Sequence, residues 1–242
     1  MEEIKTQALV IKSEPYKDSG KILTLFSLEK GLIRAKIMGV VKPKAKLAFS
    51  AQPFCFGEYI LVYKNGYSII NCTSIENFYD LTLDFDKYII GTQILEIASI
   101  IARENEINSE LFLLTLKALK MLNFSNSTPL AILIKYMIES IKIAGYKMQL
   151  DACAICHDKA PLKEKFSFSY GARVCSVCAD NNSISLSSGE SSVLKNINIT
   201  NIEDLEKLKF KGTENLTSVV KILSRYFGEK TGINLRAIKE YI

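Results

Sequence analysis

Two Cys-x-x-Cys pairs constrain the fold of this chain more than any other feature of its sequence. Cys153 and Cys156 form the first pair, Cys175 and Cys178 form the second, and eighteen residues separate the pairs. Each pair turns two thiolates toward one point, and two such knuckles complete a tetrahedral shell of four sulfur ligands. The spacing therefore predicts one structural Zn²⁺ ion held by these four cysteines. A shell closed by four protein ligands leaves no position for water or substrate, so the ion is expected to support folding and not catalysis.

Three other uses of paired cysteines remain as alternatives. Residues 153–157 read Cys-x-x-Cys-His, the signature of c-type haem attachment, but that attachment needs an exported protein and leaves the second pair unexplained. A thioredoxin-like redox pair would need a βαβ context, which the sequence lacks. Disulfides are disfavoured where thiols stay reduced. His157, the only histidine, could replace one cysteine as a ligand, but with four thiols available it is expected to be a bystander.

Composition and the N-terminus favour a cytoplasmic protein. The start, MEEIKTQ, is acidic and polar, unlike a secretory signal. The most apolar long segment, residues 130–145, is interrupted by Lys135, Glu139 and Lys142 and is predicted to be a buried helix and not a membrane span. Hydrophobic residues make up 48% of the chain and charged residues 24%, as in ordinary globular proteins. We therefore expect no membrane association.

The first 75 or so residues carry the pattern of short strands. Asn65-Gly66 lies between two apolar runs, and this dipeptide favours a tight hairpin because both residues tolerate positive φ. Five strands in this length fit a small barrel, of which the OB-fold is the best-known five-stranded case. The strands are predicted at residues 6–13, 21–27, 32–40, 57–64 and 67–74.

From about Leu81 the apolar spacing changes to that of amphipathic helices. Ser109 and Thr128 are predicted N-caps, and the last helix is predicted to end near Gly228. Helices are predicted at residues 88–104, 109–123, 129–144, 187–197 and 216–228. The predicted fold is thus an α+β multidomain protein: an OB-fold nucleic-acid-binding domain over residues 1–80, then a helical domain over residues 81–242 with a zinc-binding insert at residues 151–180.

The barrel sequence contains a strongly basic stretch. No acidic residue occurs between Glu29 and Glu58. Period-two alternation places Arg34 and Lys36 on the outer face of a strand, and the following loop adds Lys42, Lys44 and Lys46. Such cations suit the phosphates of nucleic acid, although the same run could simply be a solvated surface. Candidate base-stacking aromatics are Tyr16, Phe49, Phe54 and Tyr59.

No catalytic arrangement is visible. A chain with one histidine offers no plausible Ser-His-Asp triad, and no Gly-rich phosphate loop indicates ATP use. The remaining cysteines, Cys55 and Cys72, lie beside or on predicted strands and are expected in the core. We therefore expect a binding protein and not an enzyme.

Several segments, in order, carry a family resemblance: residues 8–12, 16–26, 29–36, 52–54, 144–146 and 226–228. Together they resemble the RecO family of bacterial recombination mediators and DNA repair proteins. No single motif is diagnostic, but their order and spacing together are specific and run nearly end to end. Ala45 and Ala237 depart from the serines expected there in many members, so a hydroxyl contact to phosphate at position 45 would be missing.

The resemblance implies a mediator of DNA repair and homologous recombination. It implies binding of single- and double-stranded DNA, annealing of complementary strands without ATP, and a nucleoid-associated place in the bacterial cytoplasm. The implied partners are RecR, the C-terminal tail of single-stranded DNA-binding protein and, indirectly, RecA. The phosphate contacts carried over are Arg34, Lys36, Lys42, Lys44 and Lys46, with Lys17 and Lys21 added. The alternatives are a zinc-ribbon and OB adaptor for protein interactions, or an RNA-binding OB protein.

Overall fold

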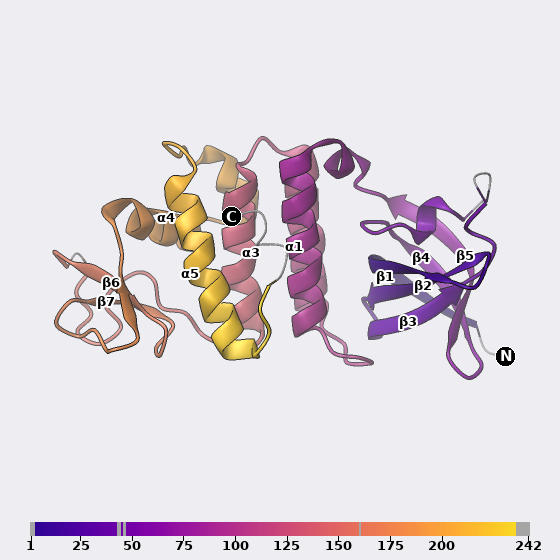
Figure 1. Ribbon diagram of the computed structural model, residues 1–242, viewed down its shortest axis with the longest axis horizontal. Helices are drawn as coiled ribbons and strands as arrows, with labels where there is room; N and C mark the ends of the chain where they lie inside the picture. The colour runs from indigo at the N-terminus through magenta and orange to yellow at the C-terminus, as the bar shows by residue number, and fades with distance from the viewer. Residues whose placement is uncertain (1–2, 43–44, 46, 160, 236–242) are drawn as a thin grey trace. The chain divides into compact units, whose positions relative to one another are not determined.

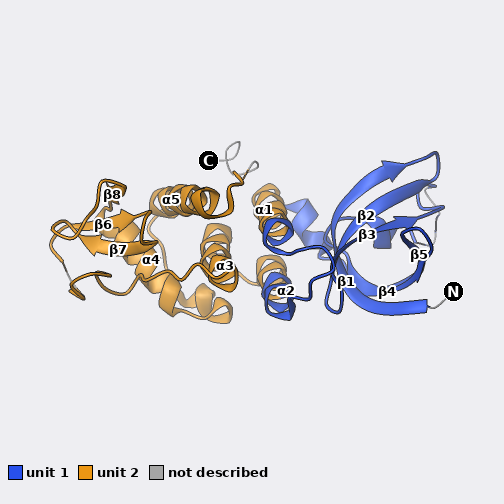
Figure 2. Cartoon of the chain, turned by 90° about the horizontal axis from the view of Figure 1, so that it is seen from below, with its two compact units in different colours: residues 1–84, 98–116 blue, residues 85–97, 117–242 orange. Residues whose placement is uncertain are grey.

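The protein forms two compact units. The structure, a computed structural model, describes residues 3–42, 45, 47–159 and 161–235 (Figure 1). One unit comprises residues 1–84 and 98–116, and the other comprises residues 85–97 and 117–242 (Figure 2). The barrel unit thus draws a second segment, residues 98–116, from beyond its strands. The domain boundary predicted between residues 80 and 81 stays a prediction.

The first unit contains a closed five-stranded barrel with the strand order β1-β2-β3-β5-β4. The β3 and β5 strands pair in parallel, and every other pair in the barrel is antiparallel. The predicted barrel is therefore confirmed, and this strand order is that of an OB-fold. The strands are β1 (Glu3–Tyr16), β2 (Gly20–Ser27), β3 (Gly31–Ile37), β4 (Phe56–Tyr63) and β5 (Tyr67–Glu76).

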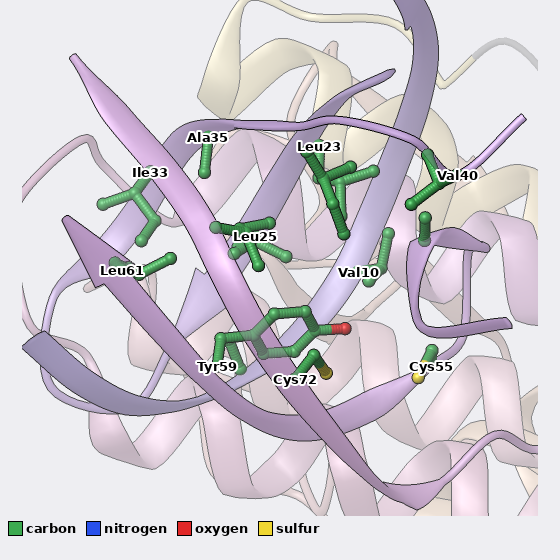
Figure 3. Packing of buried hydrophobic residues seen from close by; sticks show 14 residues of the cluster. Val10, Leu23, Leu25, Ile33, Ala35, Val40, Cys55, Tyr59, Leu61 and Cys72 are labelled. Carbon is green, nitrogen blue, oxygen red and sulfur yellow. The ribbon is translucent and has the colours of Figure 1, made fainter. Parts of the chain in front are cut away.

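Alternate residues of each strand fill the barrel, as the period of two requires. On β3, Ile33 and Ile37 are buried while Arg34 and Lys36 are exposed, so the prediction for this strand is confirmed. The ring of Tyr59 lies inside the barrel and is fully buried (Figure 3). Cys55 and Cys72 belong to the same core, as expected from their place in the sequence.

A short 3-10 helix, η1 (Phe49–Ala51), is fixed to the barrel core between β3 and β4. The Tyr59 hydroxyl donates a hydrogen bond of 2.8 Å to the carbonyl of Ser50. Ser13 Oγ donates one of 2.7 Å to the carbonyl of Ala51, whose side chain is part of the core. Because both carbonyls accept bonds from barrel residues, η1 is held rigidly.

The segment 98–116 covers one side of the barrel. The Phe112 ring meets the rings of Phe26 and Phe56 edge-on, with centroid distances of 5.3 Å and 6.2 Å. The preceding loop lies against Gly31, where an added Cβ would come within 2.1 Å of the Glu106 carbonyl oxygen. These contacts explain why a segment distant in sequence joins the barrel unit.

The second unit is built around α3, whose sequence predicted a buried helix. Eleven of its residues are buried, and the apolar run is interrupted by Lys135, which forms an ion pair of 2.9 Å with Glu139 and donates to the carbonyl of Asn198. The α3, α4 and α5 helices pack on one another. None of the described helices is long and apolar enough to cross a bilayer. Besides η1, the helices of the two units together are η2 (Tyr79–Leu83), α1 (Phe85–Ile101), α2 (Ser109–Phe124), α3 (Pro129–Ile143), α4 (Ser188–Ile199), η3 (Ile202–Lys207) and α5 (Glu214–Thr231).

Two predicted helix ends were wrong by short distances. The side chain that caps α2 is Asn108, whose Oδ1 accepts from the amide of Leu111, and not Ser109. The α5 helix continues past Gly228 to Thr231, and Gly232 ends it with a left-handed φ of 73°. Thr128 precedes Pro129 at the start of α3, as predicted, but its side chain makes no capping hydrogen bond.

The cysteine segment forms a small antiparallel sheet that sequence analysis did not predict. Its strands are three and four residues long and lie in the order β7-β6-β8 (Figure 2). Strands this short carry too few alternations for a period to be recognised. The strands are β6 (Glu164–Ser167), β7 (Ala172–Cys175) and β8 (Ser183–Ser185).

Candidate metal centre and nucleic-acid interface

The four cysteine sulfurs gather at one point. The Sγ atoms of Cys153, Cys156, Cys175 and Cys178 all lie within 4.8 Å of one another. Two of them, on Cys156 and Cys175, are 3.8 Å apart. Four thiolates converging in this way form a donor set that fits a tetrahedral ion such as Zn²⁺. The structure thus brings together the residues that the spacing indicated, and they could hold a metal ion.

Backbone groups build each knuckle around its sulfurs. The amide of Cys175 donates to Cys153 Sγ at 3.3 Å, and the amide of Cys178 donates to Cys175 Sγ at 3.4 Å. The two knuckles are joined where the amide of Ala154 donates to the carbonyl of Arg173 at 2.9 Å. Amide donors aimed at sulfur stabilise thiolates, so the backbone favours the ionised form that binds metal.

The thiol pKa values reflect this arrangement. Burial opposes ionisation of Cys153, but the backbone amides of Cys156, Cys175 and Ile155 donate to its sulfur and lower its pKa to about 6. The hydrogen bond with Cys175 is the main cause that raises the pKa of Cys178 to about 12. Neighbouring thiols do not all ionise together unless a cation balances their charge.

His157 forms part of the backbone turn of the first knuckle. It is exposed, has a left-handed φ of 61°, and its amide donates to the carbonyl of Cys153 at 2.9 Å. Among the described residues, the group of metal-ligating side chains holds the four cysteines and not this imidazole. Histidine is one of the few residues enriched in the left-handed region, which accounts for its presence in this turn.

The sheet that carries Cys175 is tied to other parts of its own unit. Arg173, 2% exposed, forms an ion pair with Glu164 and donates to the carbonyl of Leu150 at 2.6 Å. Gly171 has a φ of 60°, as a tight turn requires, and lies directly against the hydroxyl of Tyr226 on α5. The cysteine cluster is therefore part of a packed structure and not a free loop.

On the barrel, the strand register gathers cations that are distant in sequence. Lys12 on β1 pairs with Thr24 on β2, which pairs with Arg34 on β3, so one outward row carries two cations. Both side chains line a pocket of about 340 Å³ together with Glu14 and Glu104. Arg34 Nη2 lies 3.3 Å from Glu14 Oε2, so a carboxylate already partly neutralises this cation.

A second group of cations surrounds Tyr16. The ammonium of Lys17 lies 5.4 Å from the centroid of its ring, and that of Lys36 lies 5.6 Å from it. Both lysines are exposed. Lys36 lies two residues after Arg34 on β3, and both side chains are exposed. Lys36 pairs with Ile22 on β2, and Arg34 pairs with Thr24. The β1–β2 turn and β3 thus present Lys17, Lys36 and Arg34 on the same side of the barrel sheet.

Not every predicted contact belongs to this group. Lys21 is half-buried and pairs with Pro15 and Ile37, in a row that alternates with the one containing Lys36. Lys42 is exposed, and its carbonyl accepts from the amide of Ala45 at 2.9 Å. Lys44 and Lys46 lie outside the described residues.

The four candidate stacking aromatics differ in exposure. Phe54 and Tyr59 are 2% and 0% exposed, so they belong to the core and cannot stack on bases. The Tyr16 ring is half-buried and flanked by its two lysines. Phe49 is 56% exposed.

Sequence analysis missed Lys12 as a candidate contact. Period two along β1 places it outward, between buried Ile11 and half-buried Ser13, and this signal was available. Its proximity to Arg34 follows only from the register of three strands, which no local pattern specifies.

Two family models together match most of the chain. The model described as Recombination protein O N terminal matches residues 1–78, and the one described as Recombination protein O C terminal matches residues 82–237. The chain belongs to the RecO family. The family resemblance read from the sequence is thus confirmed.

Curated relatives match the sequence of this RecO family member over most of their own length. The DNA repair protein RecO of Acetivibrio thermocellus is 29% identical over 234 residues, which are 95% of this chain and 92% of that protein. The DNA repair protein RecO of Clostridium novyi is 30% identical over 227 residues, which are 93% of this chain and 88% of that protein. A third, from Shouchella clausii, is 31% identical over 175 residues, 72% of this chain.

Proposed function

We propose that this protein is a non-enzymatic mediator of DNA repair and homologous recombination that binds DNA through its barrel and anneals complementary single strands without ATP. The observation that carries the proposal is the set of exposed cations gathered from β1, the β1–β2 turn and β3 of an OB-type barrel. Family membership supports the same role, since the relatives are named DNA repair proteins. The proposed phosphate contacts are Lys12, Lys17, Lys21, Arg34, Lys36, Lys42, Lys44 and Lys46.

Lysine and arginine contacts to phosphate make binding tolerant of sequence and sensitive to salt. Each phosphate neutralised releases condensed counterions, so the logarithm of affinity falls linearly with the logarithm of salt concentration. Binding to both single- and double-stranded DNA is proposed on this ground, because both present a phosphate backbone. Annealing follows if two complementary strands, each partly neutralised, are held on one basic surface.

The test is oligonucleotide binding and annealing across a salt series. A variant with Arg34, Lys36 and Lys42 changed to Glu is expected to lose binding and annealing together and to show a shallower salt slope. Lys221→Glu is the control, since Lys221 is an exposed lysine on α5, in the other unit and not among the proposed contacts. Unchanged binding by the triple variant would overturn the assignment of the surface.

We further propose the partners that family membership indicates: RecR, the C-terminal tail of single-stranded DNA-binding protein, and RecA indirectly through loading on coated single strands. Association with purified RecR and with the tail peptide can be measured by calorimetry. RNA remains the competing ligand, because contacts of lysine and arginine with phosphate do not distinguish ribose from deoxyribose. Competition between DNA and RNA oligonucleotides of one sequence distinguishes the two.

We also propose that Cys153, Cys156, Cys175 and Cys178 hold one structural Zn²⁺ ion. The support is the convergence of four sulfurs and the amide donors aimed at two of them. A bound Zn²⁺ would balance the thiolate charge and link the two knuckles. Metal analysis of the purified protein, with chelation followed by thermal unfolding, tests this proposal.

A further inference from the structure

Two exposed aromatic rings touch each other on the barrel unit, outside the strands. Phe49 on η1 is 56% exposed and Tyr79 at the start of η2 is 51% exposed. Their ring centroids are 6.4 Å apart, and the ring planes are inclined by 41°. Because the rings are tilted toward each other and not stacked face to face, each keeps much of its surface open to solvent. Large aromatic surface left in water is costly and commonly marks a binding site.

The backbone beneath Phe49 is fixed. The two residues that follow it, Ser50 and Ala51, are buried and their carbonyls accept hydrogen bonds from Tyr59 and Ser13. The Phe49 carbonyl also accepts from the amide of Gln52 at 3.2 Å. The ring therefore projects from a rigid support and loses little conformational entropy when a ligand packs on it.

The backbone beneath Tyr79 is fixed by different contacts. Its amide donates to Asn77 Oδ1 at 3.2 Å, and its carbonyl accepts from Thr82 Oγ1 at 2.7 Å. The preceding residue, Phe78, is 3% exposed and anchors the turn in the core with a left-handed φ of 44°. Two neighbouring residues thus place one aromatic ring inside and the next one outside.

The charge of the segment that carries Phe49 favours a polyanion as the occupant, while Tyr79 is followed by exposed Asp80. Phe49 lies in the acid-free stretch between Glu29 and Glu58, seven residues after exposed Lys42. Successive turns link the two, because the amide of Ala45 donates to the carbonyl of Lys42 and the amide of Ala48 donates to that of Ala45. Aromatic surface beside cations is the arrangement by which proteins bind single-stranded nucleic acid: cations contact phosphates and rings stack on bases.

We propose that Phe49 and Tyr79 form a base-stacking platform for single-stranded nucleic acid. This inference rests on the proposed function, because it concerns the same ligand and adds the contact that separates single strands from duplex. Bases in a duplex are stacked on one another and cannot reach the rings, whereas unpaired bases can. The platform would give the protein a preference for single strands that phosphate contacts alone do not provide.

The test compares three ligands of one length, about 16 nucleotides, which covers the site size of one OB-fold. They are a single strand, the matching duplex and an abasic single strand that keeps the phosphates and lacks the bases. Phe49→Ala and Tyr79→Ala are each expected to weaken binding of the single strand about tenfold and to leave the other two ligands and the salt slope unchanged. Tyr170→Ala is the control, since Tyr170 is 52% exposed and lies in the β6–β7 turn of the other unit.

A gain-of-signal variant gives an independent measurement. The chain contains no tryptophan, so Phe49→Trp introduces a single one at the platform. Its emission is expected to be quenched by the single strand and not by the abasic strand, with affinity kept. Equal losses for all three ligands, or no loss in either alanine variant, would overturn the platform. Loss of a protein partner without any change in single-strand binding would instead assign the rings to a protein interface.

The test of the stacking platform can fail or succeed independently of the test of the proposed function. If the Arg34, Lys36 and Lys42 variant loses binding while Phe49→Ala and Tyr79→Ala do not, the basic surface stands and the platform fails. If the charge variant has no effect on any ligand but the aromatic variants lose the single strand, the platform stands and the assigned cations are wrong. Unfolding curves of each variant establish that the barrel is intact before binding is compared.

Discussion

Gly171→Ala tests whether the cysteine-bearing sheet packs on α5 as the structure places it. A Cβ at this position would lie 2.1 Å from Tyr226 Oη and 2.5 Å from Cζ. Tyr226 is 2% exposed and meets Phe166 edge-on at 5.8 Å, so its ring has little room to move aside. Alanine also carries a steric penalty at the φ of 60° found here.

The expected loss combines these two costs. A non-glycine residue in the left-handed region costs about 1–2 kcal/mol, and overpacking of a well-packed site adds about 1–3 kcal/mol. Gly171→Ala should therefore reduce the free energy of unfolding by about 2–5 kcal/mol. Gly232→Ala is the matched control, because Gly232 has a φ of 73° at the end of α5 but no atom within 4 Å of its would-be Cβ. Gly232→Ala should reduce the free energy of unfolding only by the cost of the left-handed conformation, about 1–2 kcal/mol.

Urea unfolding of the metal-loaded chain, followed by far-ultraviolet circular dichroism, measures both variants. The informative quantity is the difference between them, expected at about 1–3 kcal/mol. Changing Tyr226 to Phe in the Gly171→Ala background removes the nearest atom and should recover part of that difference. Equal losses for Gly171→Ala and Gly232→Ala would show that Tyr226 does not lie against Gly171, and the proposed docking of the sheet on α5 would be wrong.

Three further outcomes are expected. Cys175→Ser should lower metal content and stability first, and a folded, metal-free variant that selectively lost DNA binding would contradict the structural role of the cluster. Glu14→Gln should raise DNA affinity about two- to fivefold at low salt and not at high salt, since it frees an exposed cation; titrations at two salt concentrations decide this. His157→Gly should keep its metal and fold at least as stably, because glycine adopts the left-handed turn without strain, whereas metal loss on elemental analysis would make the imidazole a ligand.

Local patterns in the sequence were sufficient to predict the barrel strands and the cysteine cluster. Alternation along β3 placed Arg34 and Lys36 outward, because the side-chain period of a strand is a local property. The spacing of the four cysteines likewise indicated their convergence before the fold was known. The alternation is recognised within a few residues, and the cysteine signal comes from two local Cys-x-x-Cys pairs separated by eighteen residues.

Features that depend on long-range contacts could not be predicted in this way. The pairing of Lys12 with Arg34 across β2 needs the register of three strands, and residues 98–116 join the barrel unit through contacts such as Phe112 with Phe26. The helix ends were predicted wrongly for a different reason. Asn108 and Ser109 are both good N-caps, and the local sequence does not decide which of two adjacent candidates accepts the bond.

The surroundings of the outward cations suggest that they contribute unequally to DNA binding. Arg34 lies 3.3 Å from a carboxylate of Glu14, so phosphate must displace a partner that already balances its charge. Lys36 lies near the Tyr16 ring, which attracts a cation without neutralising it, so its full charge is available to phosphate. Lys36→Gln should therefore weaken binding and flatten the salt slope more than Arg34→Gln does. An equal or larger loss for Arg34→Gln would mean that Glu14 moves away from the arginine when DNA binds.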